Sequence, residues 1–343
     1  MKTETTNQQA SLKHSARAAR GKRSGVQVIA GAVFCVVALC GALSIMAQAQ
    51  QKVSISFQPV NVPGAAATQA YGINNKNLIV GDYINAAGAQ LGMDLKGSKV
   101  TSYSCPDGAQ TVLLGVNSGK IGVADCAGAD PLREPGPDGQ IYLAFDGHLN
   151  QLSKVCICNN PEGVAINDPE ILMVLFQDEN GNPQIGTFGV NSGVFTQLSP
   201  PEQVYEPVPN PWYPLGINNS GALVLETVNP ASGLIDSWFY SGGTYTEINV
   251  PGALSSYAHG INNNGDIVYT FLDANLRSHG ALYLASTGQF YEFDDPNGPG
   301  VTEAFGINDE VAGKKSSKLR IVGDYSLPGA LNQAFEATVT IKP

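Results

Sequence analysis

One short tripeptide recurs six times along this chain and constrains its fold more than any other feature of the sequence. Each copy is Gly or Ala, then Ile or Val, then Asn. The six asparagines are Asn74, Asn117, Asn167, Asn218, Asn262 and Asn308, so consecutive copies lie 43, 50, 51, 44 and 46 residues apart. Spacings of this length are typical of propeller blades or of helical arrays. A helical array is excluded because the chain is rich in Gly, Pro and Asn and has no apolar period of 3.6 residues.

Each copy is flanked by the residues that a four-stranded antiparallel unit requires. A polar turn follows the Asn, as in Asn263-Asn264-Gly265, and this composition suits a hairpin. Three short β-type runs follow, for example LIVGDY from Leu78, GALYLA from Gly280 and TYTEINV from Thr244. Before the Asn, bulky residues alternate with a small one, which we expect to let neighbouring backbones approach closely. The sequence therefore predicts an all-β fold, a six-bladed β-propeller with four antiparallel strands per blade.

The two ends of the mature chain together supply one complete repeat. After Asn308 only two further strands follow, RIVGDY from Arg320 and AFEATVTI from Ala334. The segment VSISFQPVNVPGA from Val53 matches the fourth-strand pattern found elsewhere. We therefore expect the N-terminal strand to close the last blade, with Val53 beside Ile341, which would leave no open array edge.

The N-terminus has the pattern of an export signal. A basic lead of six Lys and Arg residues is followed by an uncharged apolar stretch over residues 24–48, which ends in Ala47-Gln48-Ala49. We expect residues 1–49 to be a signal peptide and residues 50–343 to be the propeller of a secreted, periplasmic or cell-surface protein. The alternative is an uncleaved membrane anchor, because the apolar run is nearly long enough to span a bilayer.

The charge of the mature chain limits its partners. The full chain has a formal net charge of −10, and without residues 1–49 it carries 13 basic and 28 acidic groups. A surface with this excess of negative charge is expected to repel nucleic acid and anionic lipid. We expect a monomer that binds no nucleic acid, needs no cofactor and contacts a membrane only through an uncleaved N-terminal segment.

The repeats resemble those of the HAF family of extracellular repeat proteins. The similar segments are GINNKNLIVGDY from Gly72, GINNNGDIVYTF from Gly260, His279-Gly280-Ala281-Leu282-Tyr283, and Ile248-Asn249-Val250-Pro251-Gly252-Ala253. The resemblance covers nearly all of the mature chain, although most copies lack the motif's His. It implies export and a propeller-like fold, and it implies no defined activity.

Four cysteines remain in the mature chain. Aligned on the repeat, Cys105, Cys126, Cys156 and Cys158 all fall on one face, around the first three repeats. An even number of cysteines in an exported chain favours disulfides, and we prefer the pairs Cys105–Cys126 and Cys156–Cys158. A zinc thiolate site is the alternative.

No other metal site is expected. The recurring Asn is better explained as a cap of its own turn than as a metal ligand, because one Asn per blade does not converge on a point. The segment Asp178–Asn182 resembles part of a calcium loop, but it lacks the downstream Glu that calcium requires.

Ligand-binding candidates lie in the irregular loops. The segments over residues 127–139 and 198–214 break the repeat length, and both should lie on the face of the cysteines. The second contains Tyr205, Trp212 and Tyr213 among prolines, so it suits stacking on a sugar or a peptide, or alternatively forms a packed, stiffened loop.

Two histidines are notable. His259 occupies an inner-strand position that is apolar or aromatic in the other repeats, where it is either a channel-lining acid or base or a tolerated substitution. We expect His279 to bond a neighbouring backbone group.

No catalytic motif is present, so no catalytic residue is assigned. We expect an exported, non-catalytic repeat protein that binds a glycan or a surface protein on the cysteine-bearing face. The first alternative is a propeller enzyme, a glycan lyase or hydrolase, which requires two carboxylates or a His–carboxylate pair in the central channel. The second is a structural protein of the cell envelope.

Overall fold

The structure is a computed structural model, and it describes residues 51–106, 110–127, 141–152, 155–156, 159–205 and 215–342. The chain divides into two units, Met1–Gln48 and Ala49–Pro343, and all described residues belong to the second. The predicted signal peptide lies outside the described residues. Within the described ranges, no helix is long and apolar enough to cross a membrane.

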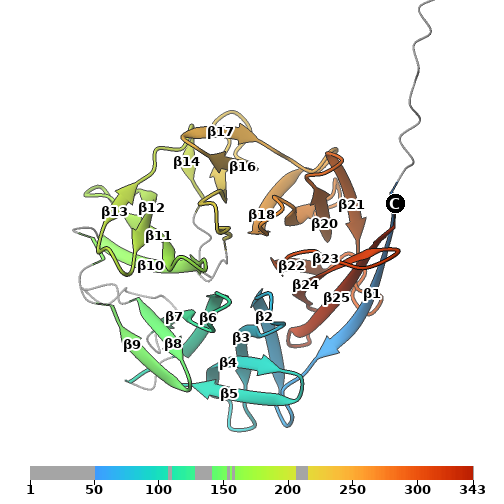
Figure 1. Cartoon of the computed structure of the whole chain (residues 1–343), viewed down its shortest axis with the longest axis horizontal. Helices are drawn as coiled ribbons and strands as arrows, with labels where there is room; N and C mark the ends of the chain where they lie inside the picture. The colour runs from blue at the N-terminus through green and yellow to red at the C-terminus, as the bar shows by residue number, and fades with distance from the viewer. Residues whose placement is uncertain are drawn as a thin grey trace, which may run out of the picture. The chain divides into compact units, whose positions relative to one another are not determined.

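Four antiparallel sheets of four strands each follow one another along the chain (Figure 1). The first two are β6 (Gln110–Val116), β7 (Gly122–Ala127), β8 (Tyr142–Phe145) and β9 (His148–Gln151), then β10 (Asn159–Ile166), β11 (Ile171–Gln177), β12 (Pro183–Gly189) and β13 (Phe195–Gln197). The next two are β14 (Gln203–Val204), β15 (Leu223–Val228), β16 (Ile235–Ser241) and β17 (Thr244–Glu247), then β18 (Ser255–Ile261), β19 (Ile267–Leu272), β20 (Ser278–Leu284) and β21 (Gln289–Phe293).

The first and last repeats share a single nine-stranded sheet. It contains β1 (Lys52–Val60), β2 (Ala67–Ile73), β3 (Ile79–Ile84), β4 (Gln90–Lys96), β5 (Lys99–Tyr103), β22 (Thr302–Ile307), β23 (Val311–Ala312), β24 (Ser317–Tyr325) and β25 (Gln333–Lys342). The prediction of six separate four-stranded sheets is wrong here, because the parallel bridge Thr68–Gln333 hydrogen-bonds β2 to β25. The extra strand β23 forms in an insertion that follows Asn308.

The predicted pairing of the chain ends is present. Strand β1 lies antiparallel to β25 over its whole length, with Val53 opposite Ile341. Its side chains alternate between exposed and half-buried, and Val53, Ile55 and Phe57 pack on the apolar core of the last repeat. Strand β1, from the start of the described chain, therefore lies beside β25, from its end. The last repeat is built from both ends.

The inner strands share a bulge that turns one side chain out of the regular alternation. In β2, β6, β10, β18 and β22 the pairing register shifts at the residue two before the Ile or Val of the tripeptide, and β10 has a second shift nearer its start. The bulged residues are Tyr71, Leu114, Val164, His259 and Phe305. A bulge re-aims the side chain that it carries, and four of these residues (Tyr71, Leu114, His259 and Phe305) line a cavity along the centre of the propeller.

The small residue of the tripeptide lies against the backbone of the next repeat, as the sequence predicts. A β-carbon added at Gly260 would lie 2.6 Å from the carbonyl oxygen of Phe305. One added at Gly306 would lie 2.9 Å from the carbonyl oxygen of Tyr71 and 3.0 Å from the Cα of Gly72. The inner strands of the last and first repeats are therefore neighbours, and only glycine fits between them.

The recurring Asn caps its own turn, as predicted, and also bonds to the next repeat. In all six repeats its side-chain oxygen accepts from a backbone N–H of the following turn, as Asn74 Oδ1 does from Leu78 at 3.0 Å. Its Nδ2 donates to the carbonyl oxygen of the next recurring Asn, first from Asn74 to Asn117 and last from Asn262 to Asn308. The Nδ2 of Asn308 donates to Asn77 Oδ1 in the first repeat.

These asparagines define the two faces of the molecule. The inner strands end at the recurring Asn, on what we call the Asn face. They begin on the opposite face, which carries Cys105 and Cys126 and which we call the cysteine face.

Replacing Gly306 by Ala tests the contact between the last and first repeats. Because the new β-carbon would press on the backbone of Tyr71 and Gly72, we expect the free energy of unfolding in urea to fall by about 1–3 kcal/mol. Gly122→Ala is the matched control, since its β-carbon would have ordinary room: the nearest side-chain atom lies at 3.3 Å and the nearest backbone atom, the carbonyl oxygen of Gly115, at 3.5 Å. Equal losses in the two variants would contradict the tight backbone contact.

Candidate functional site

The inner strands surround a narrow central cavity. Its Asn-face mouth has a volume of about 70 Å³ and is lined by the recurring asparagines and the residues that follow them. These polar groups bond mainly to one another: Asp168 N donates to Asn219 Oδ1, and Asn263 N donates to Asp309 Oδ1. Burial acts to raise the pKa of Asp168, but hydrogen bonds from Ser118 and Asn219 outweigh it and lower that pKa. The polar groups at this end of the cavity therefore bond largely to one another.

One residue of each repeat occupies the same register position toward the cysteine-face end of the inner strands, and we call these six residues the mouth ring. Each lies on an inner strand, next to a residue of the second strand of its own sheet. The mouth ring consists of Gln69, Val112, Glu162, Tyr205, Tyr257 and Glu303. Their second-strand neighbours are Asp82, Asp125, Leu175, Glu226, Thr270 and Asp324. Aromatic rings and carboxyl groups therefore gather at this end of the cavity.

Tyr205, a predicted ligand-binding residue, belongs to this ring. Part of the segment 198–214 is strand and not irregular loop, because Gln203 and Val204 pair with β15 as the start of an inner strand. The N–H of Tyr205 donates to the carbonyl oxygen of Glu226 at 2.9 Å and extends that pairing. Ile217 bridges Leu223 of the same β15, so it continues this inner strand. The extra residues of this repeat therefore fall within the inner strand in the sequence and not before it. Trp212 and Tyr213 lie outside the described residues, as does most of the segment 127–139.

A row of aromatic rings runs from the mouth ring into the cavity. Tyr205 and Tyr257 contact each other with ring centroids 5.9 Å apart, and Tyr257 stacks on His259 at 6.4 Å. His259 contacts Phe305 at 5.0 Å, and Phe305 contacts Tyr71 at 5.3 Å. Burial raises the pKa of Tyr257 to about 12, so its phenol keeps its proton at physiological pH. Tyr205 and Tyr257 are half-buried, whereas the three rings below them are buried.

His259 forms a pair with a carboxylate, as the enzyme alternative requires. Its Nδ1 lies 3.3 Å from Glu226 Oε1, and the two side chains are 0% and 2% exposed. Burial raises the pKa of Glu226 well above its ordinary value. The pair lies beneath the mouth ring, where solvent does not reach it.

A second group of carboxyls lies where the first and last repeats meet. Asp82 accepts from Gln90 Nε2 at 2.9 Å, and Asp324 accepts from Gln69 Nε2 at 3.2 Å. Burial raises the pKa of Asp82 to about 7. Burial and the nearby Glu303 raise that of Asp324 well above its usual range. These buried acids therefore hold protons that an exposed carboxyl would lose.

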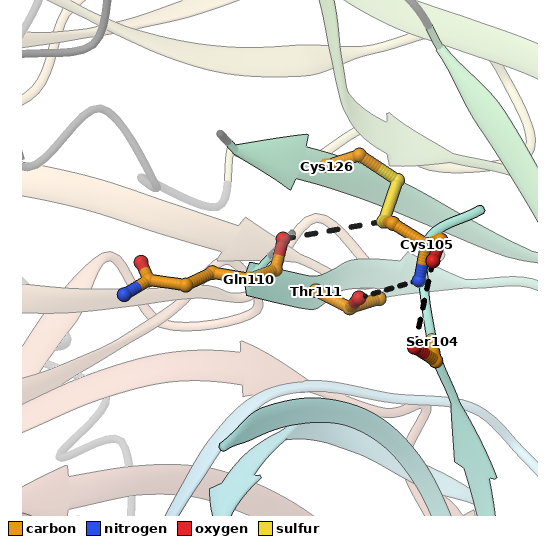
Figure 2. Close-up of a disulfide and its surroundings, with 5 residues drawn as sticks. All are labelled: Ser104, Cys105, Gln110, Thr111 and Cys126. Carbon is orange, nitrogen blue, oxygen red and sulfur yellow. Dashed lines mark hydrogen bonds between the residues drawn. A yellow bond between two sulfur atoms is a disulfide. The ribbon is translucent and has the colours of Figure 1, made fainter. Parts of the chain in front are cut away.

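The disulfide Cys105–Cys126 confirms one predicted pair (Figure 2). Cys105 follows the outer strand of the first repeat and Cys126 lies in β7, so the bond joins the first two repeats on the cysteine face. The N–H of Cys105 donates to Thr111 Oγ1 at 2.9 Å, which fixes the same crossover. Cys156 also takes part in a disulfide, and Cys158 lies outside the described residues.

The metal alternatives find no support in the described ranges. No group of three or more His, Cys, Asp and Glu side chains there is arranged to hold a metal ion. Asp178 Oδ1 accepts from the N–H groups of Asn180 and Asn182, as in an ordinary turn. The prediction that His279 bonds a backbone group is wrong, because its Nδ1 lies 2.9 Å from the Asp294 carboxylate and its Nε2 3.6 Å from that of Asp273.

Sequence reasoning missed most of the mouth ring. A signal was available: the eighth residue after the recurring Asn is acidic in three of the first five repeats, at Asp82, Asp125 and Glu226. The insertion after Asn308 moves the equivalent Asp324 eight positions further along. The second strand of each repeat pairs with the inner strand of the same repeat. A position that recurs on it is therefore expected to lie at one level around the axis.

Sheets that follow one another around a central cavity define a β-propeller, the class to which this all-β unit belongs. Neither a protein-family model nor a curated protein matches the sequence. A protein of unknown function from Dyadobacter fermentans has a similar structure, with a TM-score of 0.50 and 10% identity over 83% of this chain and 99% of that one. Less similar are TolB from Acinetobacter baumannii, with a TM-score of 0.47 and 13% identity over 82% of this chain and 67% of that one, and the Aleuria aurantia lectin, with 0.45 and 12% over 80% and 93%. At these identities the likeness concerns the fold alone.

Replacing Asp82 by Asn tests the buried carboxyl. Because its pKa rises from 3.8 to about 7 on folding, the unfolded chain loses this proton first as the pH rises. The free energy of unfolding of the wild type therefore falls between about pH 4 and pH 7 and is level above that. Asp82→Asn keeps an acceptor for Gln90 but has no carboxyl to titrate, so it lacks this fall in stability. Relative to the wild type it should gain about 2–4 kcal/mol between pH 4 and pH 8 in urea denaturation.

Glu179→Gln is the control, because Glu179 is exposed in a turn. Its pH profile should follow that of the wild type. An Asp82→Asn profile parallel to the wild type would show that Asp82 titrates as an ordinary carboxyl.

Proposed function

We propose that this chain is an exported, non-catalytic β-propeller repeat protein of the HAF type that binds a glycan at the cysteine-face mouth. The observation that carries the proposal is the row of aromatic rings that begins at the half-buried Tyr205 and Tyr257 and stands among the carboxyl groups of the mouth ring. The alternatives weighed from the sequence, a surface-protein partner and a structural envelope role, are outcomes of the test.

The chemistry of the mouth ring suits a sugar. Aromatic side chains with one polar tip offer an apolar surface for the C–H face of a pyranose ring and a hydroxyl for hydrogen bonding. Gln69 and Glu303, both half-buried, add an amide and a carboxyl that can bond sugar hydroxyls. The excess of acidic groups disfavours anionic glycans, so we propose a neutral or cationic one.

Burial argues against a hydrolase or a lyase. A general acid or base must come within hydrogen-bond reach of the atom that it protonates or deprotonates. His259 and Glu226 have 0% and 2% exposed side chains, so a bound glycan would meet Tyr205 and Tyr257 before it met this pair. The pair nevertheless keeps the enzyme as the second candidate, because a His–carboxylate pair beside the channel is what that reaction needs.

The finer architecture belongs to the same proposal. We count the nine-stranded sheet as two blades, β2 to β5 and β22, β24, β25 and β1, which gives six blades with the four separate sheets. The single bridge between Thr68 and Gln333 joins these two halves. Export is supported by the Cys105–Cys126 disulfide, since such bonds persist in oxidising compartments.

The glycan proposal is tested by a glycan array on the unit Ala49–Pro343, followed by titration of the best ligand. Tyr205→Ala and Tyr257→Ala should each weaken binding roughly 5–10-fold, because each removes one stacking surface. Phe145→Ala is the control, since this exposed aromatic side chain lies at the Asn-face end of β8. Wild-type affinity in both Tyr variants would exclude the mouth ring as the site, and failure of every glycan to bind would favour the envelope role.

The same ligand separates binding from catalysis. We expect the glycan to be recovered intact after long incubation with the protein. Cleavage that disappears in Glu226→Gln while binding persists would establish the enzyme instead.

A further inference from the structure

All nine lysines of the described residues are exposed, and all lie on the Asn face. The strand order explains this: each is in a turn after an inner strand, in a turn between third and fourth strands, or at the matching ends of β1 and β25. They are Lys52, Lys76, Lys96, Lys99, Lys120, Lys314, Lys315, Lys318 and Lys342. The described residues therefore carry an uneven charge: although the mature chain has about twice as many acidic as basic groups, a repulsion of anionic lipid expected from the net charge does not apply to this one face.

Eight of these lysines belong to the first and last repeats, and we call them the lysine patch. Lys52 pairs with Lys342, and Lys96 pairs with Lys99. Lys314, Lys315 and Lys318 lie in the insertion that contains β23. Lys76 completes the patch and also donates to the carbonyl oxygen of Ser118 at 2.7 Å. Only Lys120, in the second repeat, lies outside it.

Few negative charges offset the patch. Among the described residues of the turns and strand ends that carry the lysine patch, two are carboxylates, Asp309 and Glu310. Asp146, Asp168 and Glu170 lie on the same face but in the second and third repeats.

The cysteine face has the opposite character. The carboxylates Asp178, Glu179, Glu247 and Asp273, which are exposed or half-buried, lie in its turns and strand ends, and within the described ranges its turns contribute one cation, Arg277. Arg320, near the Asn face, is already paired with Glu336.

We propose that the lysine patch docks this propeller on the surface of an anionic lipid bilayer. A cluster of exposed lysines is attracted to anionic headgroups when it lies within about 10 Å of them. The position of the chain's entry argues for this occupant: the propeller begins at Lys52, inside the patch, directly after the apolar stretch over residues 24–48. The acidic cysteine face is repelled by the same surface, so docking leaves the mouth ring directed away from the membrane and open to ligands.

Vesicle sedimentation with the unit Ala49–Pro343 tests the proposal without the apolar N-terminal stretch. This unit is compact and contains its own apolar cores. We expect it to bind vesicles that contain phosphatidylglycerol, to ignore vesicles of phosphatidylcholine alone, and to be released by high salt. The triple variant Lys314→Gln, Lys315→Gln, Lys318→Gln should lower the partition coefficient roughly 100-fold.

Single substitutions provide the matched control. Lys315→Gln and Arg277→Gln each remove one positive charge from an exposed turn, but on opposite faces. Only the first should weaken binding. The proposal is overturned by equal effects of the two substitutions, by binding that survives the triple substitution, or by binding to a soluble polyanion with none to phosphatidylglycerol vesicles.

Discussion

The structure depends on what one buried Asn side chain does in each repeat. Its oxygen holds the turn that starts the second strand, and its amide nitrogen reaches the backbone of the neighbouring repeat, as in Asn167 and Asn218. One residue therefore sets both the local hairpin and the spacing between sheets. A shorter or purely accepting side chain would serve only the first role, which explains why Asn and not Asp or Ser recurs at all six positions.

This geometry leaves the other end of each inner strand free to vary. The glycine that lets inner strands approach also places a bulge before it, and the bulged side chain points toward the axis. Leu114 and Val164 fill that position with aliphatic groups, whereas His259 and Phe305 fill it with rings. The residue type at the Asn-face end of the inner strands is therefore the same in every repeat, whereas the residue types nearer the cysteine face differ between repeats.

Repetition explains which parts of the fold could be predicted from the sequence. The six tripeptides, the capping role of Asn74 and the pairing of Val53 with Ile341 follow from comparing the chain with itself. The bridge between Thr68 and Gln333 does not, because it depends on how closely the starts of β2 and β25 approach each other. The candidate site was predicted less well. Tyr205 and His259 stand out as exceptions to the pattern, whereas Tyr257 looks ordinary in its strand and Glu226 is seen only when the acidic position of several repeats is compared. Their place in the site becomes clear only when β14 is recognised as the first part of an inner strand that continues after extra residues. Alignment of the repeats on the recurring Asn alone gives the residues of β14 the wrong register.

The pairing of β1 with β25 also dictates the order in which the molecule can be completed. Ser56 bonds to Thr338 across a separation of 282 residues. During synthesis, strand β1 therefore waits for β25, the last strand to be made. Until then Val53, Ile55 and Phe57 have no sheet to cover, and the other repeats can assemble from neighbours in the chain. The last repeat can thus be completed only when translation has finished, since a chain truncated before β25 leaves β1 without its partner strand.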